Sequence, residues 1–231
     1  MMTQSDHMKT AKLTGAALLA TIIIGIIGAM TVNAGIDINL SADVEATARA
    51  MLEAETRLRA KAYIGLLLIG LNLIFLFGLY RLLNKSGPLL ALWGVGAGLI
   101  STAFSVFGIV ATMNAAQLAG SDAYQSLATA DQRLLLSGLQ ATTDYTSFHL
   151  SLILSSAANA GFFILFLQSG GLPKIIAGWG LFASLFVVTA LVLRDFIPLI
   201  GHGGVTAAFM VSNLIALIAM GVYLTLRGVR A

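Results

Sequence analysis

The residues best suited to chemistry in this chain are its histidines and nearby carboxylates. The sequence has three His, ten Asp and Glu together, and no Cys. His149 follows Tyr145 by four residues and Asp144 by five, while Asp195 and His202 belong to a later connection. Two imidazoles and two carboxylates can bind zinc or exchange protons with a substrate. Their spacing matches no defined motif, so we predict a structural or interfacial role, with no catalytic residue and no metal site.

The sequence also lacks the common catalytic and nucleotide-binding motifs. It contains no G-x-x-x-x-G-K loop for ATP phosphates and no H-E-x-x-H helix for a metalloprotease. The lack of Cys excludes disulfides, a thiolate nucleophile, iron–sulfur clusters and Cys-ligated zinc. We expect no cofactor and favour a protein that is not an enzyme. A membrane-embedded metal-dependent hydrolase that uses the His and Asp residues is kept as an alternative.

The composition is typical of an integral membrane protein. Of the 231 residues, 58% are apolar and 10% are charged, and the mean hydropathy is +0.92. An ordinary soluble domain has about 25% charged and 45–50% apolar residues, so that class is excluded. The net charge of +3 is too small and too dispersed to indicate a nucleic-acid partner.

Six apolar stretches are long enough to cross a bilayer, for which about 20 helical residues suffice. A spanning segment without water must satisfy its own backbone, so each is predicted to be a helix. Within them, Arg81 is the single Lys, Arg, Asp or Glu. The predicted fold class is all-α, one six-span membrane domain over residues 1–231 with outer amphipathic helices. The spans are residues 13–32, 63–82, 89–112, 148–167, 175–193 and 205–226.

The basic residues next to the first span set the predicted orientation. Lys9 and Lys12 precede this span, and the next basic residue is Arg49. Both termini are therefore expected in the cytoplasm. Residues 32–34 are also similar to a signal-peptidase site, but the apolar run exceeds the roughly 7–15 residues of a signal peptide. A retained helix is favoured over cleavage after Ala34.

Two outer connections are longer than a hairpin requires and carry amphipathic patterns. Residues 41–61 begin with Ser41 as a candidate cap, followed by acids and then by bases, the order that a helix dipole favours. Residues 114–147 repeat this design, with Thr129 as the candidate cap. Each connection is predicted to contain an outer amphipathic helix.

Polar, mostly uncharged residues lie near the middle of the predicted spans. On the fourth span they form a stripe about 120° wide when wound as a helix. In lipid such side chains need partners, so they either bond to neighbouring helices or line a path for a small ligand. The stripe comprises Asp144, Ser147, Ser151, Ser155 and Asn159. The candidate ligand-binding residues are Asn72, Ser155, Asn159, Asn213, Asp144 and His149.

Two similar turns each precede a Trp-Gly pair. Residues 86–88 lead to Trp93-Gly94, and residues 169–173 lead to Trp179-Gly180. An internal duplication with both units in the same orientation would explain this pattern. The preference of tight turns for Gly and Pro, and of membrane interfaces for Trp, would also explain it.

Two short, helix-turn-like motifs accompany the six-span plan, residues 12–15 (KLTG) and residues 169–178 (SGGLPKIIAG). In these features the chain resembles a bacterial family of multi-pass inner-membrane proteins known as domain of unknown function 4386. The resemblance implies a multi-pass inner-membrane protein and brings no established activity. Residues 157–162 lack the His- and aromatic-rich character of that family's fourth span, so no family histidine is carried over.

We therefore expect an inner-membrane protein that binds or passes a small neutral or amphipathic ligand through its polar centre. The alternative is an accessory or scaffold subunit of a membrane protein complex, in which small-residue faces and outer helices form the interfaces. The expected partners are the lipid bilayer and either a second copy of the chain or other membrane proteins, with no nucleic acid.

Overall fold

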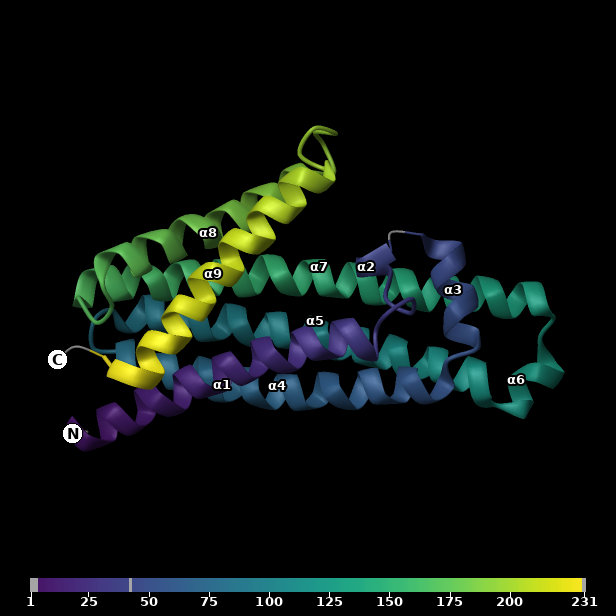
Figure 1. Cartoon of the computed structure of the whole chain (residues 1–231), viewed down its shortest axis with the longest axis horizontal. Coiled ribbons are helices and arrows are strands. Elements are labelled where there is room, and N and C mark those ends of the chain that lie inside the picture. Colours follow the sequence, from purple (N-terminus) through teal and green to yellow (C-terminus); the bar gives the residue numbers. More distant parts are fainter. Residues whose placement is uncertain (1–3, 42, 230–231) are drawn as a thin grey trace. The chain divides into compact units, whose positions relative to one another are not determined.

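The computed structural model describes residues 4–41 and 43–229, and within these ranges the chain is helical without a strand. Figure 1 labels the helices and colours them from the N-terminus to the C-terminus. The all-α fold class predicted from the sequence is confirmed. The helices are α1 (Gln4–Thr31), α2 (Ile38–Ser41), α3 (Val44–Leu52), α4 (Glu55–Leu83), α5 (Pro88–Gly120), α6 (Asp122–Leu127), α7 (Ala130–Ser169), α8 (Lys174–Leu193) and α9 (Gly203–Arg227).

Six of these helices, α1, α4, α5, α7, α8 and α9, are long and apolar enough to cross a membrane. Their most apolar windows have mean hydropathies between 1.8 and 2.3, and the chain is a multi-pass membrane protein. The helices extend past the predicted spans, since α5 has 33 residues and α7 has 40, where about 20 cross the hydrocarbon. Apolarity marks only the part of a helix that suits lipid, whereas polar flanking residues continue the same helix.

The first outer connection contains the predicted outer helix, α3, but with narrower bounds than residues 41–61 and a cap other than Ser41. Residues 41–61 do not form one helix, because α3 ends at Leu52 and residues 55–61 belong to α4. The cap of α3 is Asp43, whose carboxylate accepts a hydrogen bond from the Ala46 amide at 3.0 Å. The break contains neither Gly nor Pro, so the sequence carries no punctuation that marks it.

The second outer connection agrees with the sequence at its cap. Thr129 precedes α7, and its hydroxyl accepts a hydrogen bond from the Gln132 amide at 3.3 Å. The Gln132 side chain in turn accepts one from the Thr129 amide at 2.9 Å. This reciprocal pair is a capping box. It starts α7 at Ala130, well outside the apolar span that the same helix contains.

The chain forms two compact units. Unit 1 contains residues 1–22, 70–102 and 151–231, and unit 2 contains residues 23–69 and 103–150. Helices α1, α4, α5 and α7 contribute residues to both units. A single membrane domain over the whole chain stays a prediction.

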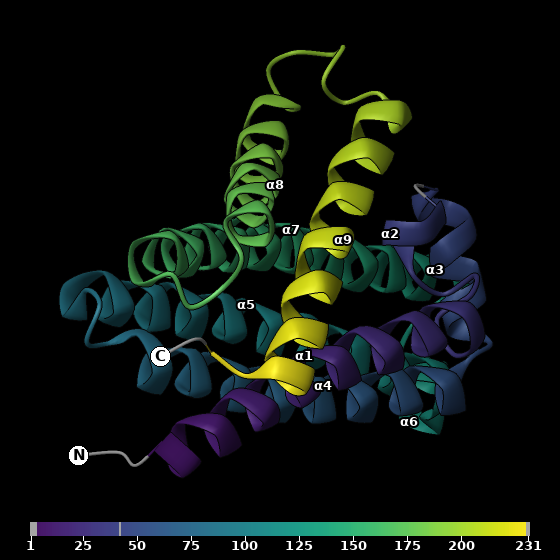
Figure 2. The same ribbon diagram turned by 60° about the vertical axis from the view of Figure 1, so that its left-hand side comes forward.

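Unit 1 has a core rich in phenylalanine. Phe162, Phe163 and Phe166 of α7 are at most 1% exposed and belong to one cluster with Leu224 of α9. Helices α8 and α9 lie side by side, as Figure 2 shows. A Cβ atom at Gly180 would lie 2.2 Å from Phe163 Cζ, so the absence of a side chain at this position lets α8 approach α7.

Unit 2 has a separate core, and a basic side chain fixes the segment that follows α1. The Arg57 guanidinium, near the start of α4, donates hydrogen bonds to the Val32 carbonyl at 2.9 and 3.1 Å and to the Ala34 carbonyl. Gly35 follows with φ of +78°, a conformation that favours glycine. The core comprises Ile36, Ile38, Met51, Ala54, Leu58, Ala115, Ala116 and Ala141.

Candidate functional site

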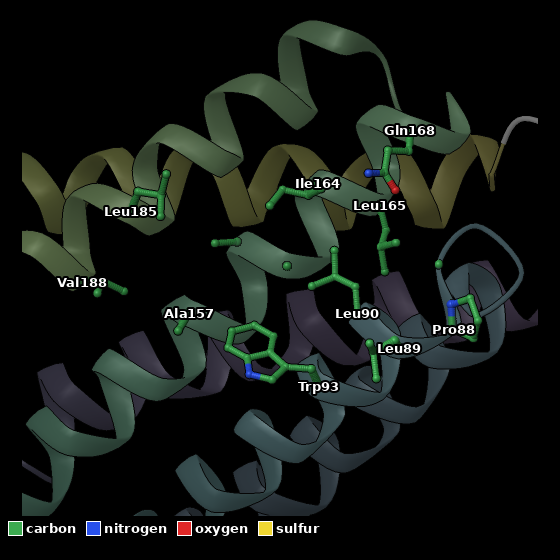
Figure 3. A pocket seen from close by; sticks show the side chains of 13 residues that line it. Pro88, Leu89, Leu90, Trp93, Ala157, Ile164, Leu165, Gln168, Leu185 and Val188 are labelled. Atoms are coloured by element: carbon green, nitrogen blue, oxygen red, sulfur yellow. The ribbon is translucent and has the colours of Figure 1, made fainter.

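An apolar pocket opens on the surface of unit 1 between α5, α7 and α8 (Figure 3). Its volume is about 890 Å³, within the range of roughly 300–1,000 Å³ that is usual for small-molecule sites. Leu89, Trp93 and Leu185 in its wall are 80%, 50% and 50% exposed. The pocket is therefore open on the outer surface of these helices. The lining consists of Gly87, Pro88, Leu89, Leu90, Trp93, Ala157, Ala160, Gly161, Ile164, Leu165, Gln168, Leu185 and Val188.

The pocket is apolar along its length and polar at one end. Gln168 brings a side-chain amide to the end where Pro88 lies, whereas Leu185 and Val188 lie at the other end (Figure 3). Such a lining can shield the apolar body of a ligand from water while the amide bonds to a polar group. The arrangement therefore suits an amphipathic molecule.

A glycine lets the turn between α4 and α5 approach α7 at the polar end. Gly87 lies between α4 and α5, and a Cβ atom there would be 2.7 Å from Leu165 Cδ2 and 3.8 Å from Gln168 Oε1. A side chain at position 87 would displace Leu165, which lines the pocket. The turn between α4 and α5 therefore packs closely against the last turns of α7.

Four of the six residues predicted to bind a ligand lie in unit 1, and the pocket lining does not include them. Asn72 Nδ2 donates to Thr102 Oγ1 at 3.2 Å, which joins α4 to α5. The Ser155 hydroxyl donates to a carbonyl of its own helix at 3.2 Å. Asn159 and Asn213 are each 9% exposed. Asn72 thus has the interhelical bond that was one of its two predicted uses.

Buried polar atoms on α7, α8 and α9 are a second feature of unit 1. The hydroxyls of Ser156, Ser184 and Ser212 and the Oδ1 atom of Asn213 have no hydrogen-bond partner among the described residues. None of the four residues is more than 9% exposed. A buried polar atom without a partner costs about 1–3 kcal/mol. Either a rotamer change or a small polar guest molecule would relieve that cost.

In unit 2, Asp144 belongs to a mostly buried ion cluster. Lys61 Nζ donates to Asp144 Oδ2 at 2.8 Å and lies 3.1 Å from Asp37 Oδ2. The three side chains are between 12% and 17% exposed. Asp37 Oδ1 also accepts hydrogen bonds from the backbone and side-chain amides of Asn39. The cluster joins α4, α7 and the segment between α1 and α2, which is the geometry of a structural clamp.

His149, the sixth predicted ligand-binding residue, packs within its own helix. Its Nδ1 lies 2.8 Å from the Tyr145 carbonyl, one turn earlier in α7. Its ring centroid is 4.1 Å from that of Tyr145 and 5.5 Å from that of Phe148. These are contacts within α7, and the structural or interfacial role of this group stays a prediction.

The other members of the predicted His and Asp group lie in unit 1. His202 caps α9, because its Nδ1 accepts a hydrogen bond from the Gly204 amide at 3.1 Å. Asp195 Oδ1 lies 3.5 Å from Nε of the preceding residue, Arg194. Across residues 4–41 and 43–229, no group of three or more His, Cys, Asp and Glu side chains is placed to hold a metal ion. The absence of a metal site in the whole chain stays a prediction.

Residues 13–228, which include the pocket and the ion cluster, match a family described as a domain of unknown function, DUF4386. The chain belongs to the DUF4386 family. The resemblance found in the sequence is thereby confirmed. No curated protein and no solved structure matches the chain.

The pocket of this DUF4386 protein was not predicted from the sequence. Trp93 stands in one of the two Trp-Gly pairs, a pattern also typical of membrane interfaces. Gln168 directly precedes the turn at residues 169–173. The sequence therefore contained one signal for the pocket, a Trp and a side-chain amide that lie beside two turns with Gly and Pro. Periodicity does not reveal that the first of these turns packs against the last turns of α7.

Proposed function

We propose that this DUF4386 protein binds a small amphipathic molecule in its membrane-spanning part, at the pocket between α5, α7 and α8. The supporting observation is the chemistry of the pocket, an apolar lining with the Gln168 amide at one end. Each CH₂ group of a ligand that moves from water to such a lining contributes about 0.8 kcal/mol to the free energy of binding. The amide can bond to the polar end of the ligand, which sets the direction in which the molecule enters.

The buried polar atoms of α7, α8 and α9 support a second candidate site, for a small neutral molecule. Ser156, Ser184, Ser212 and Asn213 bring polar atoms without a partner among the described residues. Water, or another small molecule with both donors and acceptors, would satisfy them. Asn159 and Asn213 remain ligand-binding candidates for this second site and not for the pocket.

We also propose that the protein lies in the bacterial inner membrane with both termini in the cytoplasm. The support is that Lys9 and Lys12 precede the first span and no basic residue follows it until Arg49. A reporter active only in the cytoplasm should be active when fused after Lys85 or Lys174 and silent after Asp122. Activity after Asp122 alone would invert this orientation.

The test of ligand binding uses the two tryptophans of the chain. In Trp179→Phe only Trp93 of the pocket emits, and in Trp93→Phe only Trp179 emits. The protein in detergent is titrated with brominated lysophosphatidylcholine, whose bromine atoms quench a tryptophan on contact. We expect quenching of Trp93 to saturate, whereas quenching of Trp179 should rise in proportion to the probe.

A matched pair of variants separates the pocket from the rest of the lipid-facing surface. Ala157→Phe in the Trp179→Phe background places a ring in the pocket, whereas Leu154→Phe places the same ring on α7 at a position outside the lining. We expect Ala157→Phe, and not Leu154→Phe, to abolish saturation. A Trp93 curve without a plateau, or one that Ala157→Phe leaves unchanged, would contradict the proposed site and favour the scaffold hypothesis.

A further inference from the structure

The chemistry around the pocket also indicates which amphipathic molecule it takes. Resting on the proposed function, we propose that the occupant is an anionic phospholipid. One acyl chain lies along the pocket, and the headgroup phosphate binds Lys85 and Lys174 at the polar end.

The length of the pocket indicates an extended chain. Its α7 lining runs from Ala157 to Gln168, which at about 1.5 Å per residue is about 16 Å. The hydrocarbon core of a bilayer is about 30 Å thick, so this length corresponds to about one leaflet. The lining is polar at the turn end and apolar at the other end (Figure 3). A single acyl chain below its headgroup has this shape, and a compact ligand does not.

The charges next to the polar end are positive. Lys85 lies two residues before Gly87 of the lining, and Lys174 begins α8 directly after the turn from α7. Both side chains are exposed. Lys85 belongs to the turn that packs against Leu165 and Gln168 through Gly87, and Lys174 follows Gln168 by six residues. The sequence has no Asp or Glu in residues 56–121 or 145–194, so no acid within these segments offsets the two ammonium groups.

A phosphate is the ligand that this combination recognises. Ammonium groups form charge-assisted hydrogen bonds with phosphate oxygens, and the Gln168 amide can donate to an ester or phosphate oxygen. A zwitterionic headgroup would bring its own cation to the same lysines, and the repulsion would weaken its binding. The predicted orientation puts this end in the cytoplasmic leaflet, where anionic lipids give the membrane surface a negative potential.

The experiment compares two lipids that differ in headgroup charge. The full-length Trp179→Phe variant is placed in nanodiscs of unlabelled phosphatidylcholine with increasing fractions of brominated phosphatidylglycerol or brominated phosphatidylcholine. We expect Trp93 quenching to reach half-saturation at a several-fold lower fraction of phosphatidylglycerol. Lys85→Gln with Lys174→Gln should remove this difference. The control, Lys9→Gln with Lys12→Gln, removes the same amount of charge from exposed residues of α1. This control should keep the difference between the two lipids.

The outcomes distinguish this inference from the function on which it rests. Saturable quenching at the same fraction of both lipids would overturn the anionic selectivity and leave amphipathic binding in place. Equal reduction of the selectivity by both pairs of Lys→Gln changes would also overturn the phosphate site at Lys85 and Lys174, because the effect would then come from net charge alone. Amphipathic binding would again remain in place. Quenching without a plateau for either lipid would overturn both the inference and the proposed function.

Discussion

The Lys61 ammonium group forms ion pairs with two carboxylates, Asp37 and Asp144, that are largely shielded from solvent. Without its ammonium group, two like charges would remain close together where water solvates them poorly. Removal of one partner from a buried ion pair costs about 3–5 kcal/mol. We expect Lys61→Met to reduce the unfolding free energy by this order, measured by thermal unfolding in detergent.

The exposed pair between Arg49 and Glu45 provides the control for Lys61. Their atoms approach to 2.7 Å, but the side chains are 64% and 70% exposed. Arginine stays charged in proteins, and the hydrogen bond to Glu45 raises the pKa of Arg49 further. Since water screens this pair, Arg49→Met should change the melting temperature little. Equal losses in Arg49→Met and Lys61→Met would refute the clamp.

Serine hydroxyls with and without partners should respond differently to removal. Ser184 is fully buried and its hydroxyl has no partner among the described residues, whereas the Ser101 hydroxyl donates to the Ser151 carbonyl at 2.8 Å. Polar contacts between membrane helices contribute about 0.6 kcal/mol on average. Ser101→Ala should therefore lower stability by this order. In protein with no guest molecule at the second candidate site, Ser184→Ala should leave stability unchanged or raise it. A clear loss in Ser184→Ala would mean that a guest molecule bonds to this hydroxyl.

At the residue scale, the sequence predicted which side chains carry polarity but not which of them meet. The helical stripe on α7 predicted an inward position for Ser151 and Asn159, and both are buried. The partners depend on how distant segments pack. Lys61 and Asp144 are 83 positions apart, and no periodic pattern connects them.

At the element scale, two glycines of α8 offer a direct comparison. A Cβ atom at Gly180 would lie 2.2 Å from Phe163 Cζ, whereas one at Gly178 would meet nothing within 4 Å. Overpacking a well-filled core costs about 1–3 kcal/mol, so Gly180→Ala should lower the melting temperature. Gly178→Ala should leave it unchanged or raise it, because Ala favours a helix over Gly by up to about 1 kcal/mol. The same response in both variants would contradict the close packing of α7 and α8.

The helices themselves were largely predictable. Long apolar runs must be helical in lipid, and Thr129 with Gln132 is a local capping signal that the structure contains. The break between α3 and α4 was not predictable, because no helix breaker marks it and the packing of Met51, Ala54 and Leu58 in the unit 2 core accompanies it. Tertiary contacts override local propensity at such positions.

At the scale of the whole molecule, six apolar helices and the family match agree on a multi-pass membrane protein. The pocket could not be predicted from composition, because it depends on the packing of the turn at Gly87 against Leu165 and Gln168, which are distant in sequence and lie in the same unit 1. The charge pattern was visible in the sequence, since Lys85 and Lys174 lie in segments without acids. That these lysines lie in segments next to an apolar pocket follows only from the packing of α5, α7 and α8.

Native mass spectrometry of the purified protein tests the central claim, that the pocket between α5, α7 and α8 holds an amphipathic molecule. After extensive washing in mild detergent, the wild-type chain and Leu154→Phe should each retain one amphiphile. Ala157→Phe should retain none, because its ring occupies the pocket. Equal retention in all three proteins, or none in any of them, would contradict the account.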